Sequence, residues 1–289
     1  MIGYESAYMR RKEEFGYRDG SYPGFELKDP NLEPDKAVEI LLERLRNHDE
    51  ATWMHSMVVG ELLAGFMDYM GLTKDIGWEP LIRLGQMHDV GKSKIPSEVL
   101  NKTEKLTAKE RALLKGHPLY GMGIINGIPT LRDDRAIMEL YRLAELVSFH
   151  HENWNGSGPR HRAGSSIPWP ARALTIVDQF AARGDSLRNY HVAETSYKSV
   201  LKKMNNDAGI IFDPVMLMWF NAFIADSMVN VGVGGYDELF DGLGGRGEYA
   251  NWTKADLPRF RVGEDSGVLL LERRGELRVE AAKRFSFYS

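Results

Sequence analysis

Seven residues stand out because their side chains bind divalent metal ions and because each falls where a folded core would enclose it. They are five histidines and two aspartates: His55, His88, His117, His150, His151, Asp89 and Asp178. The chain has no cysteine, so a metal site can use only nitrogen and oxygen ligands. A buried carboxylate needs a cation, a donor or a proton. One or two divalent cations would satisfy all seven groups.

Each of these residues also has a purely structural explanation. A single histidine on an apolar helix face is commonly a hydrogen-bonded core residue. Asp178 could cap a neighbouring helix or pair with Arg172 or Arg183, and the adjacent His150 and His151 could be accidental neighbours. These explanations weaken for the set as a whole, because seven polar groups are a costly way to build a hydrophobic core.

Apolar residues around these groups recur at helical spacing. His88 follows Leu81, Leu84 and Gly85 in the i, i+3, i+4, i+7 pattern of one helix face. The segment around His55 has an apolar stripe through Met54, Val58, Leu62, Met67 and Met70. We expect helices over residues 79–89, 108–115, 135–151, 170–183, 193–206 and 214–227. Thr107 and Glu110 have the spacing of a capping box before the second of these.

Three regions follow from the composition along the chain. Residues 1–35 are rich in glycine, tyrosine and charge, and their prolines disfavour a helix, so we expect an irregular arm. Residues 36–228 are helical almost throughout and should form one domain. Residues 229–289 are glycine-rich and form an expected C-terminal appendage, in which 268–271 and 277–281 could pair as a hairpin.

The overall composition excludes several classes of protein. The 289 residues are 43% hydrophobic and 27% charged, which is typical of a globular protein with a sizeable core. Against 41 acidic residues stand 37 basic ones, so binding to a nucleic-acid polymer is not favoured. No apolar stretch is long enough for a membrane span, and the first residues lack the apolar segment of a signal peptide. We therefore expect a cytoplasmic protein that does not bind membranes.

Read in order, these residues resemble the HD superfamily of metal-dependent phosphohydrolases, and within it the HD-GYP cyclic-dinucleotide phosphodiesterases. The resemblance spans about Asp49 to Phe220. The segment HDVGKSKIPSEVLNKTEKLTAKERALLKGHPLYGMGII is similar to that family's HD-x-G-K, I-P, L-N-K, K-L-T and HP-x-x-G elements, in order and spacing. HHENWNGSG and IPWPARALTIVDQF then resemble its HHE-x-W-D-G-x-G element and its last ligand-bearing helix. The resemblance implies an all-α fold of the HD type, a helical bundle.

The resemblance also implies a ligand set for two metal ions. His55, His88, Asp89 and Asp178 would hold one, and Asp89 would bridge to a second held by His117, His150 and His151. Two cations about 3.5–4 Å apart activate a bridging water as hydroxide, which attacks the phosphodiester. The outer ring nitrogens of the ligand histidines should donate to carbonyls or carboxylates, and Glu152 is a candidate acceptor. Iron or manganese suits this ligand set, and zinc or nickel is also permitted.

The sequence departs from the family in two places. Where the family has Gly-Tyr-Pro, this chain has Gly158-Pro159 without the tyrosine, which puts substrate identity and turnover in question. Some members bind a third metal through a glutamate one helical turn before the first histidine. That position is Ala51 here, with Glu50 one residue away. We therefore predict two metal ions.

Residues that would contact the substrate follow from the resemblance alone. Lys92 matches the HD-x-G-K lysine and would reach a phosphate, although it could be a surface lysine at a helix end. Arg188 and His191 resemble the family's R-P-Y-K/R element, although Arg188 could be a solvated surface arginine. The basic loop after Gly158 adds Arg160 as a further candidate.

The leading hypothesis is a binuclear phosphodiesterase that opens a cyclic dinucleotide, in the first instance cyclic di-GMP, to a linear dinucleotide or to mononucleotides. Asp89 and Lys92 would be its catalytic residues. A different class of function is a metal-containing sensor or interaction protein that binds a cyclic dinucleotide with little turnover. An HD-type nucleotidase and a diiron oxygenase are further alternatives. The sequence leaves a homodimer open.

Overall fold

The computed structural model describes residues 31–128, 142–184 and 197–229, together with Leu27, Asp29, Leu131 and three strands between 259 and 281. Most of the expected arm, the segment with Arg188 and His191, and much of the expected appendage lie outside these residues. The first part of the expected helix 135–151 also lies outside them.

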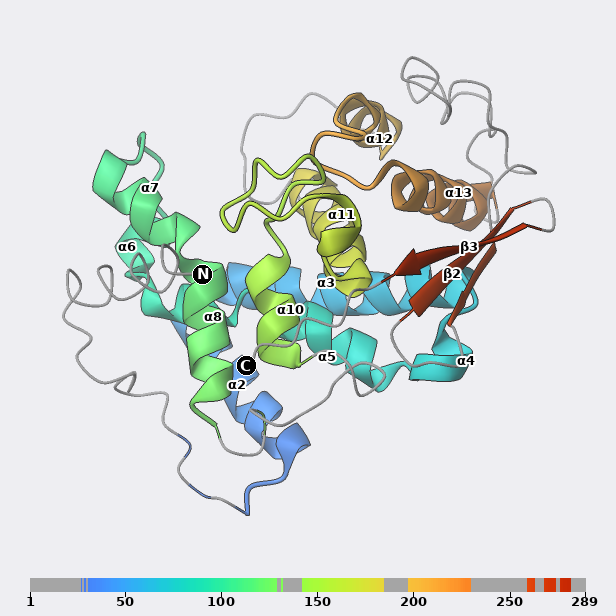
Figure 1. Ribbon diagram of the computed structural model, residues 1–289. Coiled ribbons are helices and arrows are strands. Elements are labelled where there is room, and N and C mark those ends of the chain that lie inside the picture. The colour runs from blue at the N-terminus through green and yellow to red at the C-terminus, as the bar shows by residue number, and fades with distance from the viewer. Residues whose placement is uncertain are drawn as a thin grey trace.

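The described chain is mainly helical, as expected for an all-α bundle (Figure 1). Its α-helices are α2 Pro34–His48, α3 Glu50–Tyr69, α4 Thr73–Ile76, α5 Glu79–Met87, α6 Ser97–Leu100, α7 Ala108–Lys115, α8 His117–Asn126, α10 Leu143–Phe149, α11 Trp169–Gly184, α12 Tyr197–Asn206 and α13 Pro214–Val229. Two short 3₁₀ helices are η1 Val90–Lys94 and η2 Gly164–Ser166. Helix α2 begins within the expected arm, because Pro34 fits the first turn of a helix.

Helix α3 lies at the centre of the bundle and packs against α2, α5 and α11. It approaches α5 most closely at Gly60 and Gly85, where a Cβ atom added to Gly85 would lie 2.5 Å from the Cα of Gly60. The two backbones therefore touch, and α5 is fixed against α3 just before the chain reaches His88.

The expected apolar stripe of α3 is wrong in its N-terminal half. Met54 and Val58 are 51% and 49% exposed, whereas His55 and Val59 are buried. Small and polar residues of α3 form the buried face because they allow the close approach to α5. Sequence hydrophobicity alone favours the larger Met and Val side chains and so selects the wrong face.

The capping box at the start of α7 is confirmed. The hydroxyl oxygen of Thr107 accepts a hydrogen bond from the Glu110 amide at 3.3 Å, and the Glu110 carboxylate accepts one from the Thr107 amide at 2.6 Å. The Lys102 ammonium donates to the same carboxylate at 2.7 Å. These bonds, first that from Lys102, lower the pKa of Glu110 to about 2. Helix α7 therefore begins where the sequence predicts.

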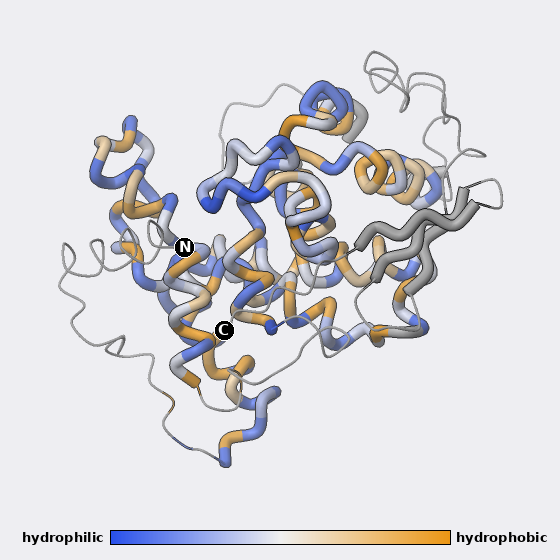
Figure 2. The backbone as a smooth tube through the Cα atoms, viewed as in Figure 1, coloured by the Kyte–Doolittle hydropathy of each residue, from blue (hydrophilic) through white to orange (hydrophobic). Residues whose placement is uncertain are grey.

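Helix α13 is predominantly apolar and belongs to the core (Figure 2). Met216 and Phe220 are fully buried on one face of it, and Leu217 is fully buried on another. Phe220 packs edge-on against Phe66 of α3, with ring centroids 5.1 Å apart. Within the described part of the chain, no helix combines the length and the apolar character needed to cross a bilayer.

The expected C-terminal hairpin is present as β2 Val268–Arg273 and β3 Glu276–Ala281, which pair in antiparallel fashion. A further strand, β1 Arg259–Val262, pairs with β2 and was not expected. The strand order is β1-β2-β3. The division of the chain into an arm, a helical domain and an appendage stays a prediction.

Candidate metal centre

The seven residues predicted as ligands come together from five separate places in the fold. Their positions are His55 on α3, His88 and Asp89 between α5 and η1, His117 at the start of α8, His150 and His151 after α10, and Asp178 on α11. All are buried except His151, which is partly exposed. Their ligand atoms form three overlapping groups, each within 4.8 Å: His117, His150 and His151; His55, His88 and Asp178; His88, Asp89 and His150.

Asp89 lies between the two halves of this cluster. Its Oδ1 atom is 3.1 Å from the Nε2 of His117, and its Oδ2 atom is 3.3 Å from the Nε2 of His88. The carboxylate is 1% exposed. One oxygen therefore faces each half, which is the arrangement that a bridging carboxylate needs.

Backbone carbonyls orient three of the imidazoles. The Nδ1 atoms of His88, His117 and His150 lie 2.6–2.7 Å from the carbonyl oxygens of Gly85, Leu114 and Val147. A carbonyl oxygen only accepts, so each Nδ1 carries a proton and each Nε2 points into the cluster. These carbonyls belong to the last turns of α5, α7 and α10, where helices leave carbonyls unbonded. The expectation that outer ring nitrogens donate to carbonyls or carboxylates is confirmed in these three cases, with carbonyls rather than Glu152 as the acceptors.

The inward nitrogens lack partners that would satisfy them. The Nε2 of His88 has no hydrogen-bond partner among the described residues, although it is fully buried. The Nε2 atoms of His117 and His150 are 3.1 Å apart, and with both protons on Nδ1 two lone pairs face one another. Divalent cations fit this donor set, because they accept lone pairs and need deprotonated nitrogens.

The other half of the cluster holds Asp178. Its Oδ1 atom accepts a hydrogen bond from the Nε2 of His55 at 2.9 Å and lies 3.6 Å from the Nε2 of His88. The alternative partners of Asp178 are engaged elsewhere: Arg172 pairs with Asp213, and Arg183 pairs with Asp207. The structural explanation of Asp178 as an arginine partner is therefore wrong.

Charges within the cluster set its protonation states. Burial opposes ionisation of Asp89 and Asp178, but nearby histidines hold the pKa of each carboxyl well below its usual value, for Asp89 together with Lys92. Burial likewise opposes a charge on His88, but Asp89 and Asp178 raise its pKa to about 10. Burial and the neighbouring His117 lower the pKa of His151 to about 4. The carboxylates thus stay ionised and draw in positive charge.

His150 is neutral for the same reasons. Burial lowers its pKa well below the usual value, and the neighbouring histidines lower it further. A neutral imidazole is the form that binds a metal ion. The half of the cluster with His150 and His151 therefore offers lone pairs without competing protons.

Lys92 lies inside the centre rather than at the surface. Its ammonium donates to the Oδ2 of Asp89 at 2.6 Å and its side chain is 16% exposed. The interpretation of Lys92 as a surface lysine is wrong. Its predicted contact with a phosphate stays a prediction.

The loop that lacks the family tyrosine is organised by Glu152. This carboxylate is 2% exposed and accepts hydrogen bonds from the amides of Arg160 and Arg162, at 2.6 and 2.7 Å. A Cβ atom on Gly158 would lie 2.7 Å from the backbone of Glu152, so only glycine fits there. The sequence analysis missed this role, and the only signal for it was the acidic residue directly after the double histidine.

Arg160, a predicted substrate residue, is occupied within the fold. Its guanidinium lies over the ring of Phe149, 4.1 Å from the centroid, and donates to the hydroxyl of Ser148. Arg188 and His191 lie outside the described residues. The three predicted contacts with substrate therefore stay predictions.

The place of a third metal ligand also differs from the family. Ala51 is exposed and offers no ligand atom. The side chain of Glu50 is 68% exposed and lies 3.7 Å from Arg46. A carboxylate engaged at the surface supports the prediction of two ions rather than three.

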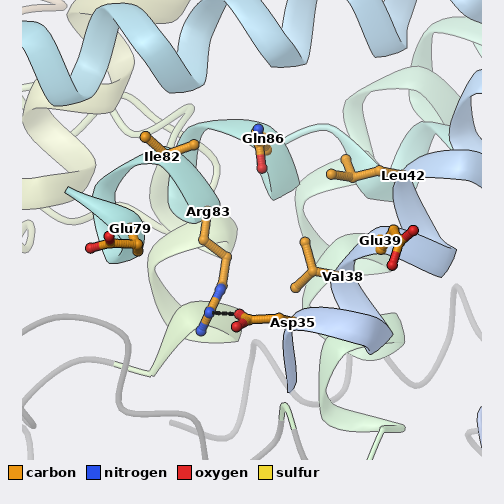
Figure 3. Close-up of a pocket in the computed structure, with 8 residues that line it drawn as sticks. All are labelled: Asp35, Val38, Glu39, Leu42, Glu79, Ile82, Arg83 and Gln86. Carbon is orange, nitrogen blue, oxygen red and sulfur yellow. Dashed lines mark hydrogen bonds and ion pairs between the residues drawn. The ribbon is translucent and has the colours of Figure 1, made fainter. Parts of the chain in front are cut away.

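A hollow of about 330 Å³ lies between α2 and α5 (Figure 3). Its lining residues are Asp35, Val38, Glu39, Leu42, Glu79, Ile82, Arg83 and Gln86. Arg83 donates to the Asp35 carboxylate across it, as the dashed line in Figure 3 shows. None of the seven cluster residues lines this hollow, so it is separate from the candidate metal centre.

The chain is similar in sequence to several known phosphodiesterases of cyclic dinucleotides. A 3'3'-cGAMP-specific phosphodiesterase 2 of Vibrio cholerae is 35% identical over 144 residues, 48% of this chain and 26% of that protein. A cyclic di-GMP phosphodiesterase of Vibrio cholerae is 28% identical over 201 residues, 66% of this chain and 39% of that protein. A cyclic di-GMP phosphodiesterase of Pseudomonas aeruginosa is 34% identical over 146 residues, 49% of this chain and 32% of that protein.

The match with these relatives is partial, since the chain spans less than two fifths of the length of each. The HD domain family itself matches residues 39–216, which is more than half of this chain and includes all seven cluster residues. The resemblance seen in the sequence is thereby confirmed at the level of the family: the chain belongs to the HD domain family.

Proposed function

We propose that this protein is a binuclear metal-dependent phosphodiesterase that hydrolyses a cyclic dinucleotide, in the first instance cyclic di-GMP. The observation that carries the proposal is the position of Asp89, with one oxygen toward His117 and the other toward His88. The names of the relatives support the substrate class, since they are phosphodiesterases of cyclic di-GMP or 3'3'-cGAMP.

The seven residues divide the work in this proposal. His55, His88 and Asp178 would hold one ion, His117, His150 and His151 would hold the other, and Asp89 would be shared between them. When bound, the two ions supply Lewis acidity and lower the pKa of a water toward ~7. Iron or manganese suits these nitrogen and oxygen ligands best.

Lys92 has a second task beside the bridging carboxylate. In the described structure its ammonium neutralises Asp89. When cations take over that charge, the ammonium can donate to an oxygen of the substrate phosphate. Lys92 thereby moves a hydrogen bond from the carboxylate to the reacting group.

A second candidate function is a sensor that binds a cyclic dinucleotide with little turnover. The observation that favours it is the loop around Gly158-Pro159, which lacks the family tyrosine and is fixed by Glu152. A calorimetric titration with cyclic di-GMP beside a product assay separates the two functions. Tight binding without product favours the sensor.

The test of the enzyme is a metal and product assay of the wild type and of Asp89→Asn. We expect the wild type to hold two ions per chain and to linearise a cyclic dinucleotide, and Asp89→Asn to lose both properties while circular dichroism stays helical. Asp207→Asn is the matched control, because that carboxylate pairs with Arg183 outside the cluster. Normal metal content and activity in Asp89→Asn would refute the assignment.

A further inference from the structure

An exposed apolar strip on α3 adjoins the face of the helix that carries His55. It consists of Ala51, Met54 and Val58, which we call the α3 strip. Met54 and Val58 are 51% and 49% exposed and stand one helical turn apart. Relative to His55, the three residues lie at i−4, i−1 and i+3, so the strip adjoins the edge of the face that carries this histidine.

The position of the strip is unusual among the exposed apolar residues. Within the described ranges the large exposed hydrophobic residues are Met54, Val58, Trp78 and Ile210. Single exposed apolar residues are ordinary. Met54 and Val58 differ because they are neighbours one turn apart on the helix that carries His55. A charged cluster and an apolar surface therefore meet at one edge of α3.

This combination matches the chemistry of a nucleotide. A phosphodiester group is anionic and belongs at the cluster, while the flat face of a nucleobase is apolar. The bases of a cyclic dinucleotide are tied to the sugars that flank each phosphate, so one of them must lie against the surface next to the cluster. The thioether of Met54 and the methyl groups of Val58 suit that face, and the small Ala51 leaves it room.

We propose that the α3 strip receives a purine base of the cyclic dinucleotide whose phosphate is bound at the cluster. The inference rests on the proposed function and assigns Met54 and Val58 to substrate binding. Neither residue has a group that takes part in the chemical step. Their contribution is therefore to affinity for the dinucleotide, through burial of apolar surface on binding.

The test is Met54→Ser and Val58→Ser in the metal-loaded full chain, with Trp78→Ser as the control. Trp78 is similarly exposed, at 42%, but lies before α5, away from the strip. We expect the Kd and the KM for cyclic di-GMP to rise about 5- to 30-fold in each strip variant, which is the effect of losing one or two kcal/mol of apolar contact. The kcat, the metal content and inhibition by inorganic phosphate should stay unchanged.

Three results would overturn the inference: an unchanged Kd, an equal loss of phosphate inhibition, or a change of oligomeric state in light scattering. The last would make the strip an interface between copies of the chain. Failure of the proposed enzymatic function can be distinguished from failure of this inference. If the wild type binds cyclic di-GMP without hydrolysing it, the Kd values of the strip variants still test the inference. A wild type that neither binds nor hydrolyses it overturns both.

Discussion

Substitution of Gly91 by alanine should disrupt both the fold and the metal centre. Gly91 belongs to η1, two residues after Asp89, and a Cβ atom placed on it would lie 2.0 Å from the carbonyl oxygen of His117 and 2.5 Å from the amide nitrogen of Gly121. The φ angle of Gly91 is not among the positive ones. Close approach of two backbones, rather than an unusual conformation, therefore requires glycine in the HD-x-G-K element.

The size of the effect follows from these distances. Ordinary carbon–oxygen contacts are at least about 3.3 Å, so η1 and α8 would have to separate by roughly 1.3 Å. Overpacking of a core costs about 1–3 kcal/mol. Because the obstacle is backbone and no rotamer relieves it, we expect a loss of about 3 kcal/mol. The shift also moves Asp89 away from His117, and sites of this kind tolerate only ~0.5 Å.

The assay is urea unfolding together with metal analysis. Gly91→Ala should unfold at a lower urea concentration and hold fewer ions than the wild type. Gly65→Ala is the matched control: its added Cβ would lie 3.5 Å from the ring of Phe223, an ordinary contact. Alanine in a helix interior should then stabilise the protein by about 0.5–1 kcal/mol. Equal stability and full metal content in Gly91→Ala would refute the described packing of η1 on α8.

Three further predictions concern the centre and its surroundings. Removal of metal by a chelator should lower the melting temperature, and elemental analysis after reloading should reach a plateau near two ions per chain; three tightly held ions would contradict the role given to Ala51. Glu152→Gln should lower the free energy of unfolding by ~2 kcal/mol, because the NH2 group of glutamine replaces one of the two carboxylate oxygens that accept hydrogen bonds from the loop amides. An unchanged urea midpoint would contradict this. Burial raises the pKa of Glu145 despite Arg160 and Arg142, so the contribution of this residue to stability should fall as pH rises through that pKa. Glu145→Gln removes this loss, so the free energy of unfolding of the variant minus that of the wild type should increase from pH 4 to pH 7 in urea unfolding.

The convergence of the seven residues could be predicted because their types are rare in a core and their order matches a known pattern. His88 illustrates this, since its helical spacing from Leu81 and Leu84 places it inward before any tertiary contact is known. The start of helix α7 could be predicted equally well, because a capping box depends only on two residues three positions apart. Local patterns of this kind do not depend on tertiary contacts, so the folded structure retains what they predict.

Other features depend on tertiary contacts that no local pattern contains. The sequence favoured Met54 and Val58 for the core, but the close approach of Gly60 to Gly85 turned α3 so that they face outward. Glu152 was expected to support a ligand histidine, yet its carboxylate binds amides eight and ten residues along the chain. Both outcomes depend on where another segment lies.

Backbone carbonyls, rather than side chains, hold three of the cluster imidazoles in place. The carbonyls that fix His88, His117 and His150 come from the C-terminal turns of α5, α7 and α10. The C-terminal end of a helix carries partial negative charge, which favours a cation nearby by about 0.3–1 kcal/mol. Three such ends meet at one cluster, so the fold itself attracts positive charge there. Because no side chain supplies these bonds, substitutions can change substrate contacts while the histidine geometry persists.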